Sequence, residues 1–282
     1  MTISMNWTEG RPRVVLLATD RTARCDRPLD RAVQLAKAWG AQLVVLHVVE
    51  RAPKGSDQST IATNLKERLF EEMPTRQVPF RVEVRFGAVS ETVLATAADV
   101  GADLIVTGVA RYNELGDYIL GTTVDQLVRK SAVPVLVVKG RPRGDYTRIL
   151  AATDHSECSA RALQVLPAFP NAEGVLMHVY HVPFEGFIDT EANAAEFRDR
   201  HAAASSEFLA GLAPEIAAGL TVEDRSGETA SVLSRAVRED GFELAVIATH
   251  GRGGLGRALI GSTAEALLGC LPCDVLIVPA GR

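Results

Sequence analysis

Apolar residues in this chain gather in short continuous runs, separated by amphipathic stretches of roughly a dozen residues. Most runs are rich in Val, Ile and Leu and do not alternate with polar residues, which is typical of parallel strands covered on both faces. The stretches between them have the length of helices that connect parallel strands. The pattern predicts strands at 13–18, 42–48, 80–86, 103–107, 134–138, 147–152, 174–180, 220–225, 243–247 and 274–278, and helices at 27–39, 59–73, 89–100, 121–131, 157–168, 189–215, 228–240 and 261–270.

The predicted elements form two similar series. RVVLLATD at 13–20 resembles RILAATD at 148–154, and VLVV at 135–138 resembles VLIV at 275–278. A unit of about 140 residues is therefore written twice, with a few insertions and deletions. The sequence predicts an α/β fold made of two tandem doubly wound domains, each with a five-stranded parallel sheet.

The boundary between the predicted domains lies near Pro142, so we expect domains at 1–142 and 143–282. Residues 139–146, KGRPRGDY, break both periodicities with Gly, Pro and charge. Because this linker is short, the two halves should pack closely.

Composition narrows the classes of function. The net charge is −5, which disfavours a general nucleic-acid binder. No apolar run approaches the roughly 18 residues of a membrane-spanning helix, so no membrane partner is expected. The four cysteines have no disulfide-framework spacing, and the N-terminus has no signal-peptide shape. These features favour the cytoplasm.

A glycine-rich stretch, HGRGGLGRALIGST at 250–263, lies between a predicted strand and a predicted helix. Glycines let the backbone approach an anion closely, and the amides of the helix N-terminus attract phosphate. Arg252 and Arg257 add positive charge. The stretch is not a P-loop. Gly251-x-Gly253-x-x-Gly256 is a literal GxGxxG, but Asp274, near the usual distance beyond it, opens the next strand instead of closing one, so the context of a dinucleotide site is missing.

Thr153 and Asp154 follow the first strand of the second half, at the edge where a doubly wound sheet binds its ligand. Asp154 could accept from a ribose hydroxyl or an adenine amino group, or ligate Mg²⁺. It could equally cap the next helix. Ser262-x-x-Glu265 likewise has the form of a capping box, and Thr122-x-x-Asp125 is a weaker one. The residues leave these alternatives open.

Taken together, TD after the first strand, LHV in the second, GxxG-x9-G[ST] after the fourth and a PVLVV-type last strand resemble the universal stress protein family. The resemblance covers nearly the whole chain as a tandem pair. It implies the same α/β fold and binding of ATP, ADP or AMP. It also implies that the glycines and G[ST] line the phosphates, while the Asp and the Val after the strand-two His line the adenosine.

Carried over residue by residue, the resemblance assigns the nucleotide site to the second half. There Ala248 replaces the first glycine, which adds one methyl group. The proposed nucleotide-binding residues are Thr153, Asp154, Val179, Gly251, Arg252, Gly261, Ser262 and Thr263.

The first half matches the pattern less well. Arg111 stands where the second glycine of GxxG belongs, and the loop after it is acidic, which repels a polyphosphate. We therefore expect a degenerate site there. The matching residues in this half are Asp20, Val48, Gly108, Gly121 and Thr122.

Other reactive side chains carry weaker signals. Cys270 and Cys273 form one CxxC at a helix C-terminus, where the dipole opposes a thiolate, so Cys273 is expected to be a small buried residue. His178 and His181 fall on opposite faces of a strand, which disfavours a shared metal, and no metal site is predicted. His47 and His178 recur in both halves and are expected to support the strand end. His155 and His250 flank the proposed pocket.

The sequence favours a regulatory protein that binds an adenine nucleotide. No residue stands out as a catalytic base, although slow ATP hydrolysis stays open. One alternative is an adenylating enzyme, but its glycine-rich loop is missing from DRTARC at 20–25 and DHSECS at 154–159. Another is a nucleotide-free interaction scaffold. In the family that the chain resembles, the last strand often forms a dimer contact, so the resemblance implies that the edges at 135–138 and 275–278 cover each other in an intramolecular pseudo-dimer. A further homodimer is implied only by the resemblance.

Overall fold

Two compact units, Met1–Asp145 and Tyr146–Gly281, make up the chain. The structure is a computed structural model. It describes residues 7, 10–21, 26–53, 55, 57–74, 77–109, 111–112, 118–119, 121–181, 191–250 and 260–280.

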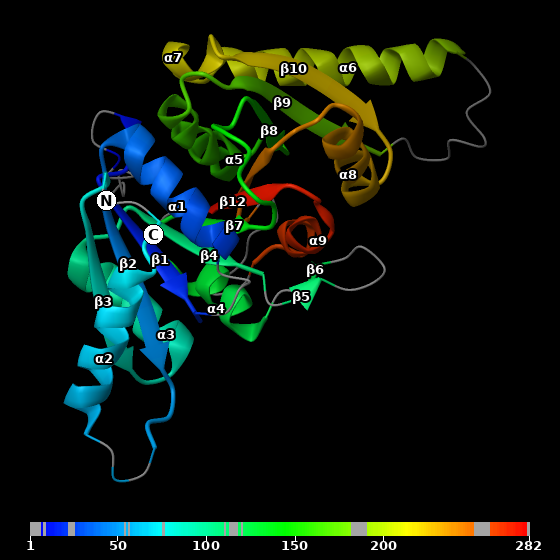
Figure 1. The fold of residues 1–282 in the computed structure, drawn as a ribbon. Helices are drawn as coiled ribbons and strands as arrows, with labels where there is room; N and C mark the ends of the chain where they lie inside the picture. The colour runs from blue at the N-terminus through cyan, green and yellow to red at the C-terminus, as the bar shows by residue number, and fades with distance from the viewer. Residues whose placement is uncertain are drawn as a thin grey trace. The chain divides into compact units, whose positions relative to one another are not determined.

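Unit 1 contains a parallel sheet with the strand order β7-β4-β1-β2-β3 (Figure 1). A short antiparallel pair, β5 with β6, lies outside this sheet and was not predicted. The elements are β1 (Val14–Thr19), α1 (Asp26–Trp39), β2 (Gln42–Val49), α2 (Gln58–Glu71), β3 (Phe80–Phe86), α3 (Val89–Val100), β4 (Leu104–Gly108), β5 (Arg111–Tyr112), β6 (Tyr118–Ile119), α4 (Thr122–Lys130) and β7 (Val135–Val138).

Unit 2 repeats the arrangement with the parallel order β12-β11-β8-β9-β10. Its elements are β8 (Arg148–Thr153), α5 (Glu157–Ala162), a 3₁₀ helix (Leu163–Ala168), β9 (Glu173–Tyr180), α6 (Glu191–Ala210), α7 (Pro214–Ala217), β10 (Leu220–Ser226), α8 (Thr229–Glu239), β11 (Leu244–Ala248), α9 (Ser262–Cys270) and β12 (Asp274–Val278). The prediction of two doubly wound five-stranded domains is confirmed. The pseudo-dimer stays a prediction.

Strand order decides which helices share a face of each sheet. In unit 2 the chain steps outward from β8 to β9 and β10, then returns to β11 and β12. Right-handed crossovers therefore place α5 and α6 on one face and α8 and α9 on the other. Contacts of α6 with β10 and of α8 with α9 agree with this. The order reverses between β8 and β11, as it does between β1 and β4 in unit 1.

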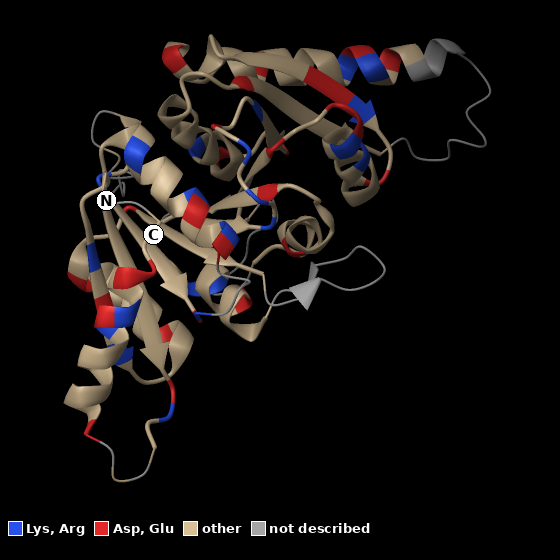
Figure 2. Cartoon of the chain, viewed as in Figure 1, with Lys and Arg blue, Asp and Glu red and all other residues tan. Residues whose placement is uncertain are grey.

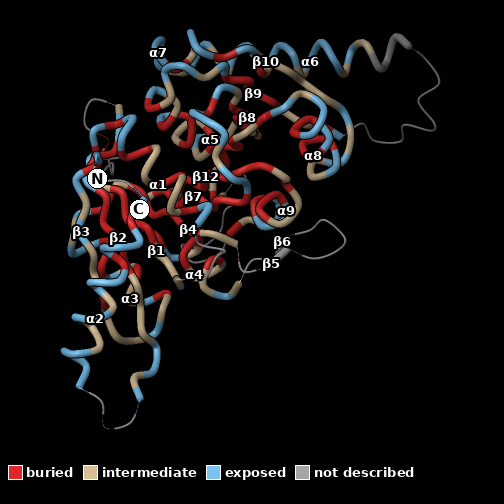
Figure 3. Tube along the Cα trace, viewed as in Figure 1, coloured by how far each residue is buried: buried red, intermediate tan, exposed pale blue. Residues whose placement is uncertain are grey.

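The core of each unit lies between sheet and helices, and Figure 3 shows the central strands buried while the outer helix faces are exposed. In unit 2, Leu176 of β9 and Leu163 are fully buried and pack with Leu220 of β10. Acidic and basic residues lie mainly on helices and loops, with both signs mixed on each unit (Figure 2). Among the described helices, none combines the length and the apolar character that crossing a membrane requires.

Two predicted helices differ from the observed ones. The helix predicted at 189–215 ends at Ala210, and a separate short helix follows at Pro214–Ala217. Gly211 weakens the helix, and Pro214 has no amide hydrogen to continue it. The helix predicted at 157–168 becomes 3₁₀ from Leu163, where Pro167 lies inside the last turn. Propensity alone overestimated the length of both helices.

The start of α8 is held by the side chain of Glu228, which accepts hydrogen bonds from the amides of Ala230 and Ser231. Hydrogen bonding, first from Ser231 and then from Ala230, lowers the pKa of Glu228 below its ordinary value of 4.5. A folded-state pKa below the unfolded one stabilises the protein at pH values above the unfolded pKa. This contribution is lost as the pH falls through the folded pKa.

We therefore expect Glu228→Gln to lower the melting temperature at pH 7 by about 1–3 °C, because a neutral amide is a weaker acceptor at a helix N-terminus. The difference from wild type should vanish in acid, below the lowered pKa. Differential scanning calorimetry at pH 7 and in acid, below the folded-state pKa of Glu228, measures both. Glu239→Gln, the same charge change at the other end of α8, is the control. An equal loss at both pH values would contradict the role assigned to the carboxylate.

Candidate functional site

The carboxyl edge of the unit 2 sheet brings together strand ends and a helix N-terminus. Thr153 is the last residue of β8, and its register partner His178 directly precedes Val179 on β9. On the other side of β8, strand β11 ends at Ala248, and the chain returns to this edge at Gly261 to begin α9. The described members of the predicted set therefore lie on one edge. Gly251 and Arg252 lie outside the described residues.

The turn after β8 is fixed by its own side chains. The hydroxyl of Thr153 accepts from the amide of His155 at 2.9 Å, and a carboxylate oxygen of Asp154 accepts from the amide of Ser156 at 3.1 Å. Ser156, rather than Asp154, caps α5 by accepting from the amide of Ser159. The alternative in which Asp154 caps the helix is therefore wrong.

His155 has a φ of 61°, and Arg21 has a φ of 60° at the same place in unit 1. A left-handed residue in this turn is therefore a repeated feature of the fold. It directs the side chain of His155 to Phe208 and His178, whose rings lie 5.2 and 4.1 Å away between centroids. The side chain of His155 therefore lies under α6, which carries Phe208 and covers the opposite face of the sheet from α9, so it points away from the start of α9.

The N-terminus of α9 has no side-chain cap. Gly261 is the N-cap residue and Ser262 the first helical residue, so the predicted capping box is wrong. The same correction applies to Thr122, which follows the N-cap Gly121. The first helical hydrogen bond runs from the amide of Glu265 to the carbonyl of Gly261. The amides before it give this end of the helix a partial positive charge.

Close packing explains the glycine at 261. Its amide donates to the carbonyl of Thr249 at 2.7 Å. A β-carbon there would lie 3.3 Å from the same oxygen, which is tight for any side chain. The hydroxyl of Thr249 also accepts from the amide of Ala280 and bonds Nδ1 of His250. Thr249 thus fixes both ends of the glycine-rich segment.

His250 begins that segment and leaves one polar atom unsatisfied. Nδ1 of His250 lies 2.9 Å from the Thr249 hydroxyl, whereas Nε2 is buried and has no hydrogen-bond partner among the described residues. A buried nitrogen without a partner is costly unless something else satisfies it. An anion at the start of α9 is one group that could do so.

Unit 1 has a cavity at the corresponding edge, with a volume of about 440 Å³. This lies within the range of small-molecule sites, roughly 300–1,000 Å³. All five residues that the resemblance assigns to the first half line the cavity: Asp20, Val48, Gly108, Gly121 and Thr122. Glu50, Val89 and Val93 also line it and were not predicted. Val89 and Val93 lie in α3, which begins shortly after Gly87. Because Gly87 recurs as Gly227 before α8, this repeat could have pointed to the start of α3 as part of the site.

The side chain of Arg111 lies outside the described part of the chain. The expectation that the first site is degenerate therefore stays a prediction. The cavity shows only that the five matching residues of unit 1 line one hollow.

Two other predictions are confirmed. His47 and His178 each bond the last carbonyl of the neighbouring first strand through Nδ1, at 2.9 Å to Thr19 and 3.1 Å to Thr153. Both therefore support a strand end. Cys273 is buried just before β12, as expected of a small apolar residue.

Comparison with known proteins gives a consistent result in both halves. The model of the "Universal stress protein family" matches residues 12–139 and 145–279. A Thermus aquaticus protein named "Universal stress protein in QAH/OAS sulfhydrylase 3'region" is 30% identical over 135 residues, which is 45% of this chain and 98% of that protein. "Universal stress protein A homolog 1" of Coxiella burnetii is 29% identical over 44% of this chain and 94% of its own length.

Solved structures resemble the whole chain. A functionally unknown protein from Pseudomonas aeruginosa PAO1 matches with a TM-score of 0.68 at 24% identity, covering 96% of this chain and 94% of its own. A universal stress protein from Archaeoglobus fulgidus matches with a TM-score of 0.67 at 19% identity, covering 95% and 99%. At these identities the likeness shows the fold alone.

Proposed function

Because the chain belongs to the universal stress protein family, we propose that it is a stress-response protein whose C-terminal unit binds ATP or a related adenine nucleotide. Binding would change its shape or partners, without rapid turnover. The observation that carries the proposal is the uncapped N-terminus of α9 at the carboxyl edge of β8 and β9.

The phosphates would bind at the start of α9. Ser262 and Thr263 are exposed there, and within the described part of the chain no side chain caps their end of the helix. The helix dipole and free amides favour an anion. His250 Nε2, which lacks a partner among the described residues, adds a nitrogen that can donate to a phosphate oxygen. Gly251 and Arg252 belong to the proposed set on their sequence alone.

The adenosine would bind between the ends of the first two strands. Thr153 is held by bonds to His155 and Ser159, so the turn that carries Asp154 is preorganised. Asp154 and Val179 are both half-buried at this edge. A carboxylate can accept from ribose hydroxyls, and a valine can contact the base. In unit 1 the matching Asp20 and Val48 line the cavity, which supports these roles.

Calorimetric titration with ATP, ADP and AMP, with and without Mg²⁺, tests the proposal. We expect one nucleotide per chain and phosphate release well below the roughly 1 s⁻¹ of an efficient phosphotransferase. Fast turnover would favour an enzyme, and no binding would favour the scaffold. Two nucleotides per chain would show that unit 1 is also a working site.

A further inference from the structure

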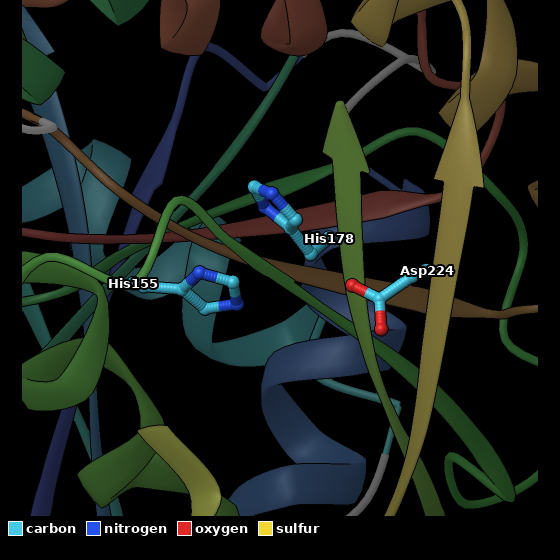
Figure 4. A group of neighbouring side chains, drawn as sticks. All are labelled: His155, His178 and Asp224. Atoms are coloured by element: carbon cyan, nitrogen blue, oxygen red, sulfur yellow. The ribbon is translucent and has the colours of Figure 1, made fainter. Parts of the chain in front are cut away.

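A second group of reactive side chains lies in unit 2, next to the turn that carries Asp154. It consists of His155 in the turn after β8, His178 on β9 and Asp224 on β10 (Figure 4). One potential ligand atom from each lies within 4.8 Å of the others. His178 and Asp224 are direct register partners on neighbouring strands, so the sheet itself holds two of the three.

This group occupies the face of the sheet covered by α6. Side chains two residues apart on a strand share a face, so His178 lies on the side of Leu176, and Asp224 on the side of Val222. Leu176 and Val222 belong to a core cluster that includes Phe208 of α6. Val179, which is proposed to contact the nucleotide, points to the other face. His178 and Asp224 therefore lie on the opposite face of the sheet from Val179.

Hydrogen bonds orient the histidine rings. Nδ1 of His178 lies 3.1 Å from the carbonyl oxygen of Thr153. Because a carbonyl can only accept, Nδ1 carries the hydrogen, and the lone pair of the neutral ring is on Nε2. A backbone carbonyl bonded to one imidazole nitrogen is the usual outer partner of a metal-binding histidine.

Ser205 of α6 links the other two members. Its hydroxyl donates to a carboxylate oxygen of Asp224 at 2.6 Å and lies 2.9 Å from Nε2 of His155. Ser205 is fully buried, and all three members of the group are half-buried. Among the described residues, Asp224 has no lysine or arginine partner. A half-buried carboxylate beside two imidazoles, without a cation, is a suitable environment for a metal ion.

The internal repeat provides a comparison within the same chain. The residues at these positions in unit 1 are Arg21, His47 and Val84, because Arg21 shares the left-handed turn and Val84 is the register partner of His47. Only the strand-two histidine is common to both units. Since the fold forms without the other two, His155 and Asp224 are not needed to build it.

We propose that His155, His178 and Asp224 bind a divalent transition-metal ion such as Zn²⁺. Two imidazoles and a carboxylate are a common ligand set for this class of ion, with a fourth position open to water. Tetrahedral ligands around zinc lie about 3.3 Å apart, so the side chains must close in slightly, and Ser205 then supports Asp224 from behind. The sequence pairs His178 with His181 and so misses a site that only the fold assembles.

The test is titration of the metal-free full chain with Zn²⁺, and with Co²⁺ followed by visible absorption. We expect one ion held by nitrogen and oxygen, without the near-ultraviolet bands of cysteine ligation. Asp224→Asn and His155→Gln should each lower the affinity by about 100-fold or more, since loss of an outer partner alone costs about 10–100-fold. Zn²⁺ should raise the melting temperature of wild type but not of Asp224→Asn.

His47→Gln is the matched control, because His47 makes the same carbonyl bond in unit 1 but lacks the other two ligands. It should bind the ion as wild type does. Asp224→Asn retains the oxygen that accepts from Ser205, so one variant should fold even if His155→Gln does not. Unchanged affinity in a folded variant, or no ion bound by wild type, would show that these residues form only a hydrogen-bond network and overturn the proposal. Neither result depends on nucleotide binding.

Discussion

Ser262→Asp is expected to weaken ATP binding by about 100-fold while leaving the melting temperature unchanged or slightly raised. Ser262 is the first residue of α9 and is exposed. A carboxylate there is attracted by the positive end of the helix dipole, which stabilises the folded state. Against a phosphate about 4 Å away, the same charge costs up to roughly 4 kcal/mol before screening by salt. If salt screening leaves half of this repulsion, the affinity for ATP falls about 30-fold, and if it leaves three quarters, the affinity falls about 150-fold.

Thr122→Asp is the matched control, because Thr122 opens α4 of unit 1 after an uncapped Gly121. If only unit 2 binds nucleotide, this variant should titrate as wild type does. Calorimetric titration and thermal melting of both variants provide the comparison. Normal ATP binding by Ser262→Asp would refute the phosphate position at α9. Loss of binding only in Thr122→Asp would move the site to the cavity of unit 1.

Ser262→Asp is expected to leave stability unchanged or raised while it weakens nucleotide binding, which distinguishes a lost binding site from a lost fold. A variant that merely misfolds loses both together, whereas this change is expected to separate them. Capping and phosphate binding use the same end of the helix, and the structure shows that Gly261 leaves that end without a side-chain cap. The sequence alone could not choose between the two uses, because Ser262-x-x-Glu265 has the spacing of a capping box.

The fold was predictable because its signals are local or repeated. Continuous apolar runs such as the one at Leu244–Ala248 indicate buried parallel strands, and the second copy of each element supports the first. The strand-end histidines were predicted for the same reason, since His47 and His178 recur. The predicted helix lengths were wrong where single residues decide the end of a helix. Gly211 and Pro214 end a helix whose composition favours continuation.

Contacts across the sheet could not be predicted in the same way. His155 and Asp224 are far apart in sequence and come together through the left-handed turn at 155 and the register of β9 with β10. Neither is visible in a hydropathy pattern. The cavity in unit 1 likewise depends on how α3 and α4 sit against the strand ends. The resemblance identified five of its lining residues, yet gave no measure of its volume.

The largest expected loss of stability is that of Leu176→Ala. Leu176 is fully buried in the core of unit 2, in a cluster with Ala151, Leu163, Ile216 and Leu220. Truncation removes apolar contacts and leaves a cavity, which costs about 3 kcal/mol within the usual range of about 2–5. We expect the urea unfolding curve, monitored by far-ultraviolet circular dichroism, to show an additional phase at lower urea concentration, because unit 2 would unfold first.

The two tryptophans make the assignment of that phase possible. Trp7 and Trp39 are the only tryptophans in the sequence, and both lie buried in unit 1, with ring centroids 6.0 Å apart. Because each unit has its own core, the fluorescence midpoint of Leu176→Ala should stay where it is in wild type. Val45→Ala, which truncates the matching position in β2, should lower the fluorescence midpoint instead, with a loss of about 2 kcal/mol. A joint shift of both signals in Leu176→Ala would mean that the units unfold as one, as close shielding of their last strands in a pseudo-dimer would require.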